Sequence, residues 1–122
     1  MARNTPEGGG FASGITADEI AAINRRFGGC TTLTGEVSTS LANAARREGF
    51  WSKTASLVRD IAGGHKFNDG NKRTAQVVVE ELKARNGVTT GITPDQLRKI
   101  VQQVATGELR EVEDIAKALR GF

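Results

Sequence analysis

The residues most able to do chemistry lie together in one short stretch, HKFNDGNKR, from His65 to Arg73. It contains the single histidine of the chain, His65, and four residues later the carboxylate of Asp69. An imidazole titrates near neutral pH, so His65 is suited to act as general base toward a hydroxyl nucleophile. Asp69 is suited to bind Mg²⁺, an ion that bridges a carboxylate and phosphates.

The four residues after Asp69 are suited to hold phosphate, namely Gly70, Asn71, Lys72 and Arg73. A glycine lets the backbone turn sharply and approach a ligand, and consecutive amides at the start of a helix form a concave anion site. Lys72 and Arg73 add positive charge at the helix end where the dipole favours acids, which indicates an anion there. With His65 and Asp69, these residue types predict phosphoryl or nucleotidyl transfer from a Mg²⁺–nucleotide.

A purely structural interpretation of the same stretch is also open. Asp69 or Asn71 could serve only as a helix N-cap, and Phe67 is expected to anchor the loop in the core. A binding module that merely holds an anion needs neither a base nor a metal ligand. The presence of both His65 and Asp69 therefore favours chemistry.

Hydrophobic spacing around this stretch predicts an all-α fold, a compact bundle of about six helices. Two helix starts carry a capping box, Thr16 with Glu19 and Thr93 with Gln96. The expected helices cover residues 16–27, about 40–47, about 52–61, 72–85, 93–105 and a last one that includes 112–119. The helix over 72–85 is expected to be central and buried, because Ala75, Val78, Val79 and Leu82 recur at helical spacing.

One stretch before the site does not read as a core helix. Residues 30–37, CTTLTGEV, are rich in Thr and Val and predict a short β-hairpin or an irregular loop. Residues 1–14 are rich in Gly and are expected to form a flexible lead-in, followed by one catalytic domain over 15–122.

Composition excludes several classes of protein. The sequence has no apolar run that could span a membrane and no secretory signal, and its single cysteine rules out an internal disulfide. Lys and Arg number 17 and Asp and Glu 14, a net charge of +3, with acids and bases interspersed and aromatics at 5%. This pattern does not favour a nucleic-acid binder, which usually clusters its basic residues.

The stretch from His65 to Arg73 resembles the signature of the Fic/Doc family, H-x-F-x-(D/E)-G-N-(G/K)-R, and meets every specified position. Residues 71–87, NKRTAQVVVEELKARNG, and the later VATGE at 104–108 look like the Doc branch in particular. The resemblance covers roughly residues 15–119. It implies the small all-helical fold of that family, with a β-hairpin flap that docks the target protein by strand addition and for which residues 30–37 are the candidate.

The resemblance also implies an activity with Mg²⁺ as cofactor and ATP as co-substrate. Fic enzymes transfer AMP to a protein hydroxyl, whereas Doc toxins transfer the γ-phosphate to a Ser/Thr hydroxyl of a translation protein such as elongation factor Tu. By resemblance, His65 is the general base and Asp69 the Mg²⁺ ligand. The phosphate and ATP site is then formed by Gly70, Asn71, Lys72 and Arg73.

Two positions decide between the alternatives. Lys72 occurs as in Doc toxins, where AMP transferases have a second Gly, while Gly70 occurs as in AMP transferases, where Doc toxins have Ala. We expect γ-phosphate transfer, because a lysine changes the charge and volume of the pocket and a change from Ala to Gly does neither. AMP transfer is the alternative, and a non-enzymatic anion-binding module is the second alternative.

The sequence also bears on regulation. It contains no (S/T)-x-x-x-E-(G/N) segment of the kind that inhibits many Fic proteins from within. A separate antitoxin or immunity protein is therefore the expected partner, besides the protein target. The expected location is the bacterial cytoplasm, either as a free toxin or as the C-terminal module of a larger protein delivered into a target cell.

Overall fold

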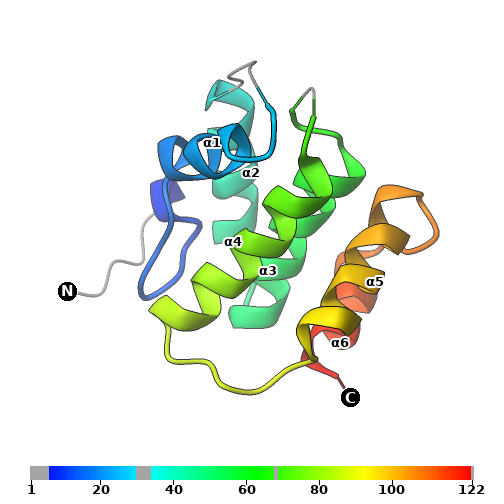
Figure 1. The fold of residues 1–122 in the computed structure, drawn as a ribbon. Helices are drawn as coiled ribbons and strands as arrows, with labels where there is room; N and C mark the ends of the chain where they lie inside the picture. Colours follow the sequence, from blue (N-terminus) through cyan, green and yellow to red (C-terminus); the bar gives the residue numbers. More distant parts are fainter. Residues whose placement is uncertain (1–5, 30–33, 68, 122) are drawn as a thin grey trace.

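The described part of the chain, residues 6–29, 34–67 and 69–121 of a computed structural model, folds into helices without a strand (Figure 1). The all-α prediction is confirmed. The described residues form six α-helices together with a 3₁₀ turn, η1 (Pro6–Gly8), and a π-helical turn, η2 (Arg59–Gly63). The α-helices are α1 (Ala17–Arg25), α2 (Thr34–Ala45), α3 (Phe50–Val58), α4 (Asn71–Arg85), α5 (Pro94–Ala105) and α6 (Val112–Arg120).

Helix α4 is the central helix, as its spacing predicts. It packs against α1, α3, α5 and η2, while α3 also contacts α2 and α6. Figure 1 shows α1 and α2 on one side of α3 and α4, with α5 and α6 on the other. The buried face of α4 consists of Thr74, Ala75, Val78, Val79 and Leu82. Its first turn lies at the surface, where Lys72 and Arg73 are exposed. The candidate site at this turn is therefore open to solvent, while the rest of the helix anchors it in the core.

The two predicted capping boxes are both present. Thr16 Oγ1 accepts from the Glu19 N–H at 3.1 Å, and Glu19 Oε1 accepts from the Thr16 N–H at 2.9 Å. Thr93 and Gln96 make the same pair of bonds at the start of α5, at 3.2 and 3.0 Å. These bonds satisfy N–H groups that a helix start leaves free, so α1 and α5 begin where the sequence predicts.

The prediction for residues 30–37 is wrong where the structure describes it. Residues 34–37 form the first turn of α2, and residues 30–33 lie outside the described residues. The helix starts six residues earlier than predicted because Val37, Leu41 and Ala44, at helical spacing, are at most 1% exposed. Burial of this face overrides the strand preference of the Thr and Val residues. No β-hairpin flap is therefore formed by residues 34–37.

The segment before α1 packs onto the body from Pro6 onward. Phe11 is 2% exposed and its ring lies edge-on to that of Phe50, with centroids 5.7 Å apart. At the C-terminal end of α4, Arg85 Nη1 donates to the carbonyl oxygen of Gly14 at 2.9 Å. Residues 6–14, part of the expected lead-in, are thus held by core packing and by α4. No helix in the described ranges is both long and apolar enough to cross a membrane.

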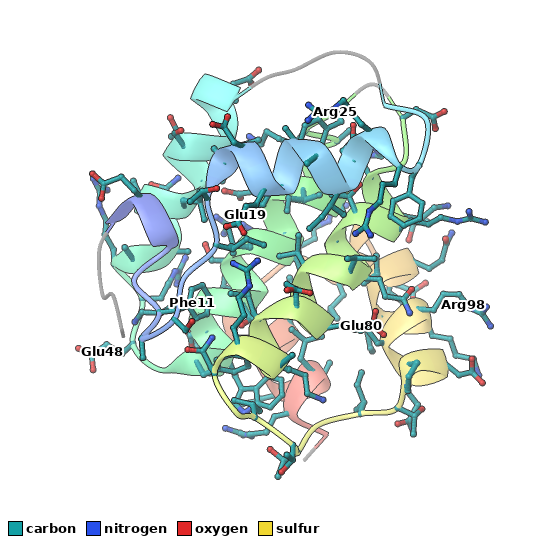
Figure 2. All side chains as sticks on the ribbon, turned by 60° about the vertical axis from the view of Figure 1, so that its left-hand side comes forward. Phe11, Glu19, Arg25, Glu48, Glu80 and Arg98 are labelled. Carbon is teal, nitrogen blue, oxygen red and sulfur yellow. The ribbon has the colours of Figure 1, made fainter. Side chains whose placement is uncertain are left out.

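Arg85 also fixes α1 to α4. Its Nη2 lies 2.6 Å from Glu19 Oε2, and Figure 2 shows Glu19 between the two helices. The hydrogen bond from Arg85 is the largest cause that lowers the pKa of Glu19 to about 2, and the same pairing raises the pKa of Arg85. The folded protein therefore favours the ionised carboxylate, which orients α1 over the central helix.

Candidate active site at the start of α4

The chain enters the candidate site through a turn after η2, and this turn has an unusual backbone conformation. α3 continues into η2, and the Lys66 N–H donates to the Ile61 carbonyl at 3.2 Å as the helix ends. Among the described residues, His65 is the only non-glycine with a positive φ, 47°. Left-handed backbone costs a non-glycine residue about 1 kcal/mol, and such strain is concentrated at functional sites. The turn leaves the imidazole of His65 exposed.

The loop that follows is closed by Asn71. Its Oδ1 accepts from the Phe67 N–H at 2.8 Å, and its Nδ2 donates to the Phe67 carbonyl at 2.7 Å. Phe67 is 3% exposed and belongs to the core, as the sequence predicts. The side chain of Asn71 thus holds the loop closed, a role distinct from the phosphate contact expected of it. Asn71 also lines the cavity at the site.

Gly70 is the N-cap of α4, with φ 71° and ψ 15°, and it supplies no side-chain cap. A Cβ at this position would lie 2.7 Å from the Phe27 carbonyl oxygen and 2.9 Å from the Phe27 Cβ. Glycine is therefore required twice, for the left-handed backbone and for the close approach to Phe27. Asp69 lies beside it, and its Oδ1 accepts from the Gly70 N–H at 2.8 Å.

The first turn of α4 contains two exposed cations and no acid. Neither Lys72 nor Arg73 forms an ion pair with a carboxylate in the described part of the chain. The Arg73 guanidinium lies over the Phe27 ring, 5.9 Å from its centroid, and that of Arg26 lies at the same distance. Their charges add to the partial positive charge of the helix start, so this surface attracts an anion.

All six sequence-predicted site residues line one cavity of about 590 Å³. They are His65, Asp69, Gly70, Asn71, Lys72 and Arg73, and the cavity is completed by Phe27 and by Gln102, Ala105 and Thr106 at the end of α5. The tertiary structure thus brings an imidazole, a carboxylate, helix-start residues and two cations to one cavity. This is the set of groups that phosphoryl transfer uses.

A second groove, of about 540 Å³, adjoins this cavity. Both are lined by Phe27, Lys72, Arg73 and Gln102, and the groove continues between α4 and α5. Glu80 of α4 and Arg98 of α5 line it (Figure 2). A ligand bound at the start of α4 therefore has room to extend along the helix.

The position of Asp69 is compatible with a Mg²⁺ ion whose remaining ligands are water molecules and the phosphates of a bound substrate. Proteins bind Mg²⁺ through one or two carboxylates, with waters and substrate phosphates as the other ligands. The Asp69 carboxylate is exposed on the wall of the cavity, beside the amides and cations that suit phosphate. Within the described residues no group of three or more His, Cys, Asp or Glu side chains could hold a metal ion without such help.

One buried residue near the site was missed by the sequence prediction. Asn24 of α1 is 1% exposed, and its Nδ2 donates to the Asp69 carbonyl at 2.7 Å and to Thr74 Oγ1 at 3.0 Å. A signal was present in the sequence, because Asn24 follows Ile20 by four residues and so falls on the apolar face of the helix. The helix expected over residues 16–27 ends earlier, at Arg25, so Phe27 lies in the turn after α1.

Comparison with known proteins identifies a relative by sequence. Over 74 residues the chain is 34% identical to a protein named Toxin Doc from Mycolicibacterium smegmatis. The matched stretch covers 59% of this chain and 56% of that protein, so the match spans a little over half of the relative's length. No model of a known protein family matches the chain, and no solved structure does. The chain is thus similar to a Doc toxin over part of its length.

Proposed function

We propose that this chain is a toxin of the Fic/Doc type that transfers the γ-phosphate of ATP to a hydroxyl group of a protein. The observation that carries the proposal is that the base, the carboxylate and the two cations of one nine-residue stretch line a single cavity at a helix start. The similarity to Toxin Doc over 59% of the chain supports the same assignment. The target hydroxyl, Mg²⁺ and ATP are part of the proposal.

The proposed step is a direct displacement at phosphorus. The His65 imidazole accepts the proton of the target hydroxyl, whose oxygen forms a bond to the γ-phosphorus while the bond to the β–γ bridging oxygen breaks. ADP leaves, and the products are the phosphorylated target and one proton. The amides of the first turn of α4 donate hydrogen bonds to the transferred phosphoryl group, and Lys72 and Arg73 stabilise its negative charge. Asp69 would hold Mg²⁺, which supplies positive charge to the nucleotide phosphates.

Local packing explains the glycine that Doc toxins lack. A side chain at Gly70 would collide with the backbone of Phe27, so glycine is needed here whichever group is transferred. Gly70 therefore gives no support to AMP transfer. Lys72, exposed on the cavity wall, remains the position that favours the γ-phosphate.

The partners follow from the same proposal. The target is a Ser/Thr hydroxyl of a translation protein such as elongation factor Tu, and a separate antitoxin or immunity protein restrains the enzyme. The site of action is the bacterial cytoplasm, reached by synthesis there or by delivery. These assignments rest on the resemblance and on the relative's name.

The test is a transfer assay with ATP labelled on either the α- or the γ-phosphate, in bacterial lysate with Mg²⁺. We expect a protein band labelled only by γ-labelled ATP, and we expect His65→Ala to lower its rate by about a hundredfold or more. Lys66→Ala is the matched control, because Lys66 is the next residue and does not line the cavity. A band with the α label would assign AMP transfer, and labelling that survives His65→Ala would exclude His65 as the base.

A further inference from the structure

Two buried side chains beneath the site join α1 to the start of α4. Asn24 is 1% exposed and Thr74 is 0% exposed, and neither lines a cavity at the site. Asn24 Nδ2 donates to the Asp69 carbonyl and to Thr74 Oγ1. Thr74 Oγ1 in turn donates to the Gly70 carbonyl at 2.7 Å, in addition to the helical bond that this carbonyl accepts from the Thr74 N–H at 2.9 Å. The carbonyl oxygens of two consecutive site residues are therefore held from the inside.

Holding these carbonyls also orients two N–H groups. A peptide group is planar and trans, so its N–H points opposite to its C=O. Fixing the Asp69 carbonyl inward thus turns the Gly70 N–H outward, where it holds Asp69 Oδ1 at 2.8 Å. Fixing the Gly70 carbonyl turns the N–H of Asn71 outward from the first turn of α4. One of these groups orients the carboxylate, and the other, which has no hydrogen-bond acceptor among the described residues, is a donor for an anion.

The slot that holds the Asn24 amide is tightly fitted. A Cβ on Gly29 would lie 1.6 Å from Asn24 Oδ1, and a Cβ on Gly70 would lie 3.3 Å from its Nδ2. Burying an amide without hydrogen bonds is costly, and both hydrogens of Nδ2 are used here. The amide is therefore fixed in one orientation by its neighbours and its bonds.

We propose that Asn24 and Thr74 are positioning residues, which set the direction of the phosphate-binding amides and of the Asp69 carboxylate from beneath the site. The inference rests on the proposed function in so far as the ligand is a nucleotide phosphate. The hydrogen bonds from Asn24 and Thr74 on which it is based are the same whichever group is transferred. Small errors in the placement of such donors reduce rates by about a hundredfold, even when the altered residue does not touch the substrate.

The chain offers a matched control for Thr74. Thr54 is also 0% exposed, and its Oγ1 donates to the carbonyl four residues earlier, Phe50, at 2.8 Å. Thr54 lies in α3 and lines neither cavity at the site. Replacing either threonine by valine keeps the shape and removes the hydrogen bond to the carbonyl four residues earlier. At Thr74 the acceptor of one Asn24 N–H is lost as well, so Thr74→Val is expected to lose more stability than Thr54→Val.

The first measurement needs no activity. Amide NMR signals of Gly70 and Asn71 are followed in the full chain while inorganic phosphate is added. In Thr74→Val we expect both signals to move from their wild-type positions, and we expect the phosphate affinity to fall about tenfold. In Thr54→Val we expect neither change. Unchanged Gly70 and Asn71 signals in Thr74→Val would overturn the inference, whatever the enzyme transfers.

The second measurement uses γ-phosphate transfer. We expect Thr74→Val to lower kcat at least tenfold more than Thr54→Val, with KM for ATP changed less than threefold, under conditions in which urea unfolding shows both variants to be folded. Thr74→Ser keeps the hydroxyl and should restore kcat to within twofold of wild type. Asn24→Asp, which cannot donate, should act in the same direction if it folds. Equal kcat in the two valine variants overturns the inference, whereas a wild type without transfer refutes the proposed function and leaves the NMR test in force.

Discussion

The starts of α4 and α5 differ in how their free N–H groups are satisfied. α5 begins with Thr93, whose side chain closes a capping box, then Pro94 and an acid, Asp95, in the first turn. α4 begins with Gly70 in a left-handed conformation, has no side-chain cap, and is followed by Lys72 and Arg73 with no acid. The first arrangement satisfies the helix start from within. The second leaves amides and positive charge available to a ligand.

The difference teaches that the start of α4 gives up local stability, and the proposed function supplies a reason, the binding of an anion. Two cations near a helix N-terminus interact unfavourably with the helix dipole, and a glycine in place of a capping side chain costs roughly a few tenths of a kcal/mol. The site is kept in place by other contacts, from Asn71 to Phe67 and from Asn24 to Asp69. Variants that exchange the two arrangements should therefore separate stability from function.

The largest effect is expected from Gly70→Ala. The Cβ meets the Phe27 backbone at 2.7 Å, so the free energy of unfolding should fall by about 3 kcal/mol, and phosphate transfer should fall with it. Gly87→Ala is the control, because Gly87 has a similar φ of 65° with nothing within 4 Å of a Cβ. It should cost about 1 kcal/mol. Urea unfolding measures both, and equal costs would contradict the close approach to Phe27.

Charge reversal at Lys72 should move stability and function in opposite directions. Lys72→Glu places an acid in the first turn of α4, so stability should rise by about 0.5 kcal/mol while transfer falls about a hundredfold. Lys99→Glu, on an exposed position within α5, should leave transfer within twofold of wild type. Urea unfolding and the γ-label assay test both. Full activity of the Lys72→Glu variant would show that Lys72 does not bind the phosphate.

Removing the cap of α5 should lower stability and leave transfer unchanged. Thr93→Ala breaks the capping box, and the free energy of unfolding should fall by about 1 kcal/mol. Thr93 lines neither cavity at the site, so transfer by the folded enzyme should stay within twofold of wild type. Denaturation and the transfer assay are compared at a temperature where both proteins are folded. A matching loss of activity would show that the start of α5 also serves the ligand.

The smallest effect concerns the start of α1, where Glu19 is both a capping residue and an ion-pair partner. Its pKa is about 2 in the folded protein, below the ordinary 4.5, so its contribution is complete above about pH 4.5 and is lost as pH falls toward about 2. Glu19→Gln keeps the capping acceptor and removes the charge.

The side chain of Glu19 is 41% exposed, so solvent screening limits the expected difference from wild type to about 0.5 kcal/mol near pH 7. That difference should disappear near pH 2. Urea unfolding of both proteins across this pH range measures it. A difference that does not change with pH would mean that the ion pair contributes nothing.

Much of the fold could be predicted because its signals are local. Thr16 and Glu19, and likewise Thr93 and Gln96, lie three residues apart, so their hydrogen bonds depend on one turn of chain. α2 could not be predicted in full, because its first turn favours strand by residue type and is helical through burial of Val37. The helix predicted over about 52–61 is present, but its last part is the π-helical turn η2, and that form has no local signature.

The candidate site divides in the same way. The sequence by itself determined which groups are present, since the imidazole, the carboxylate, the glycine and the cations all fall within His65 to Arg73. It also determined that a helix starts among them. Only the tertiary structure decided that Phe27 requires glycine at position 70 and that Asn24 holds Asp69 across 45 residues of sequence. Periodicity and capping act over about four residues, whereas packing joins segments far apart in the chain, and that packing aims the groups of the site.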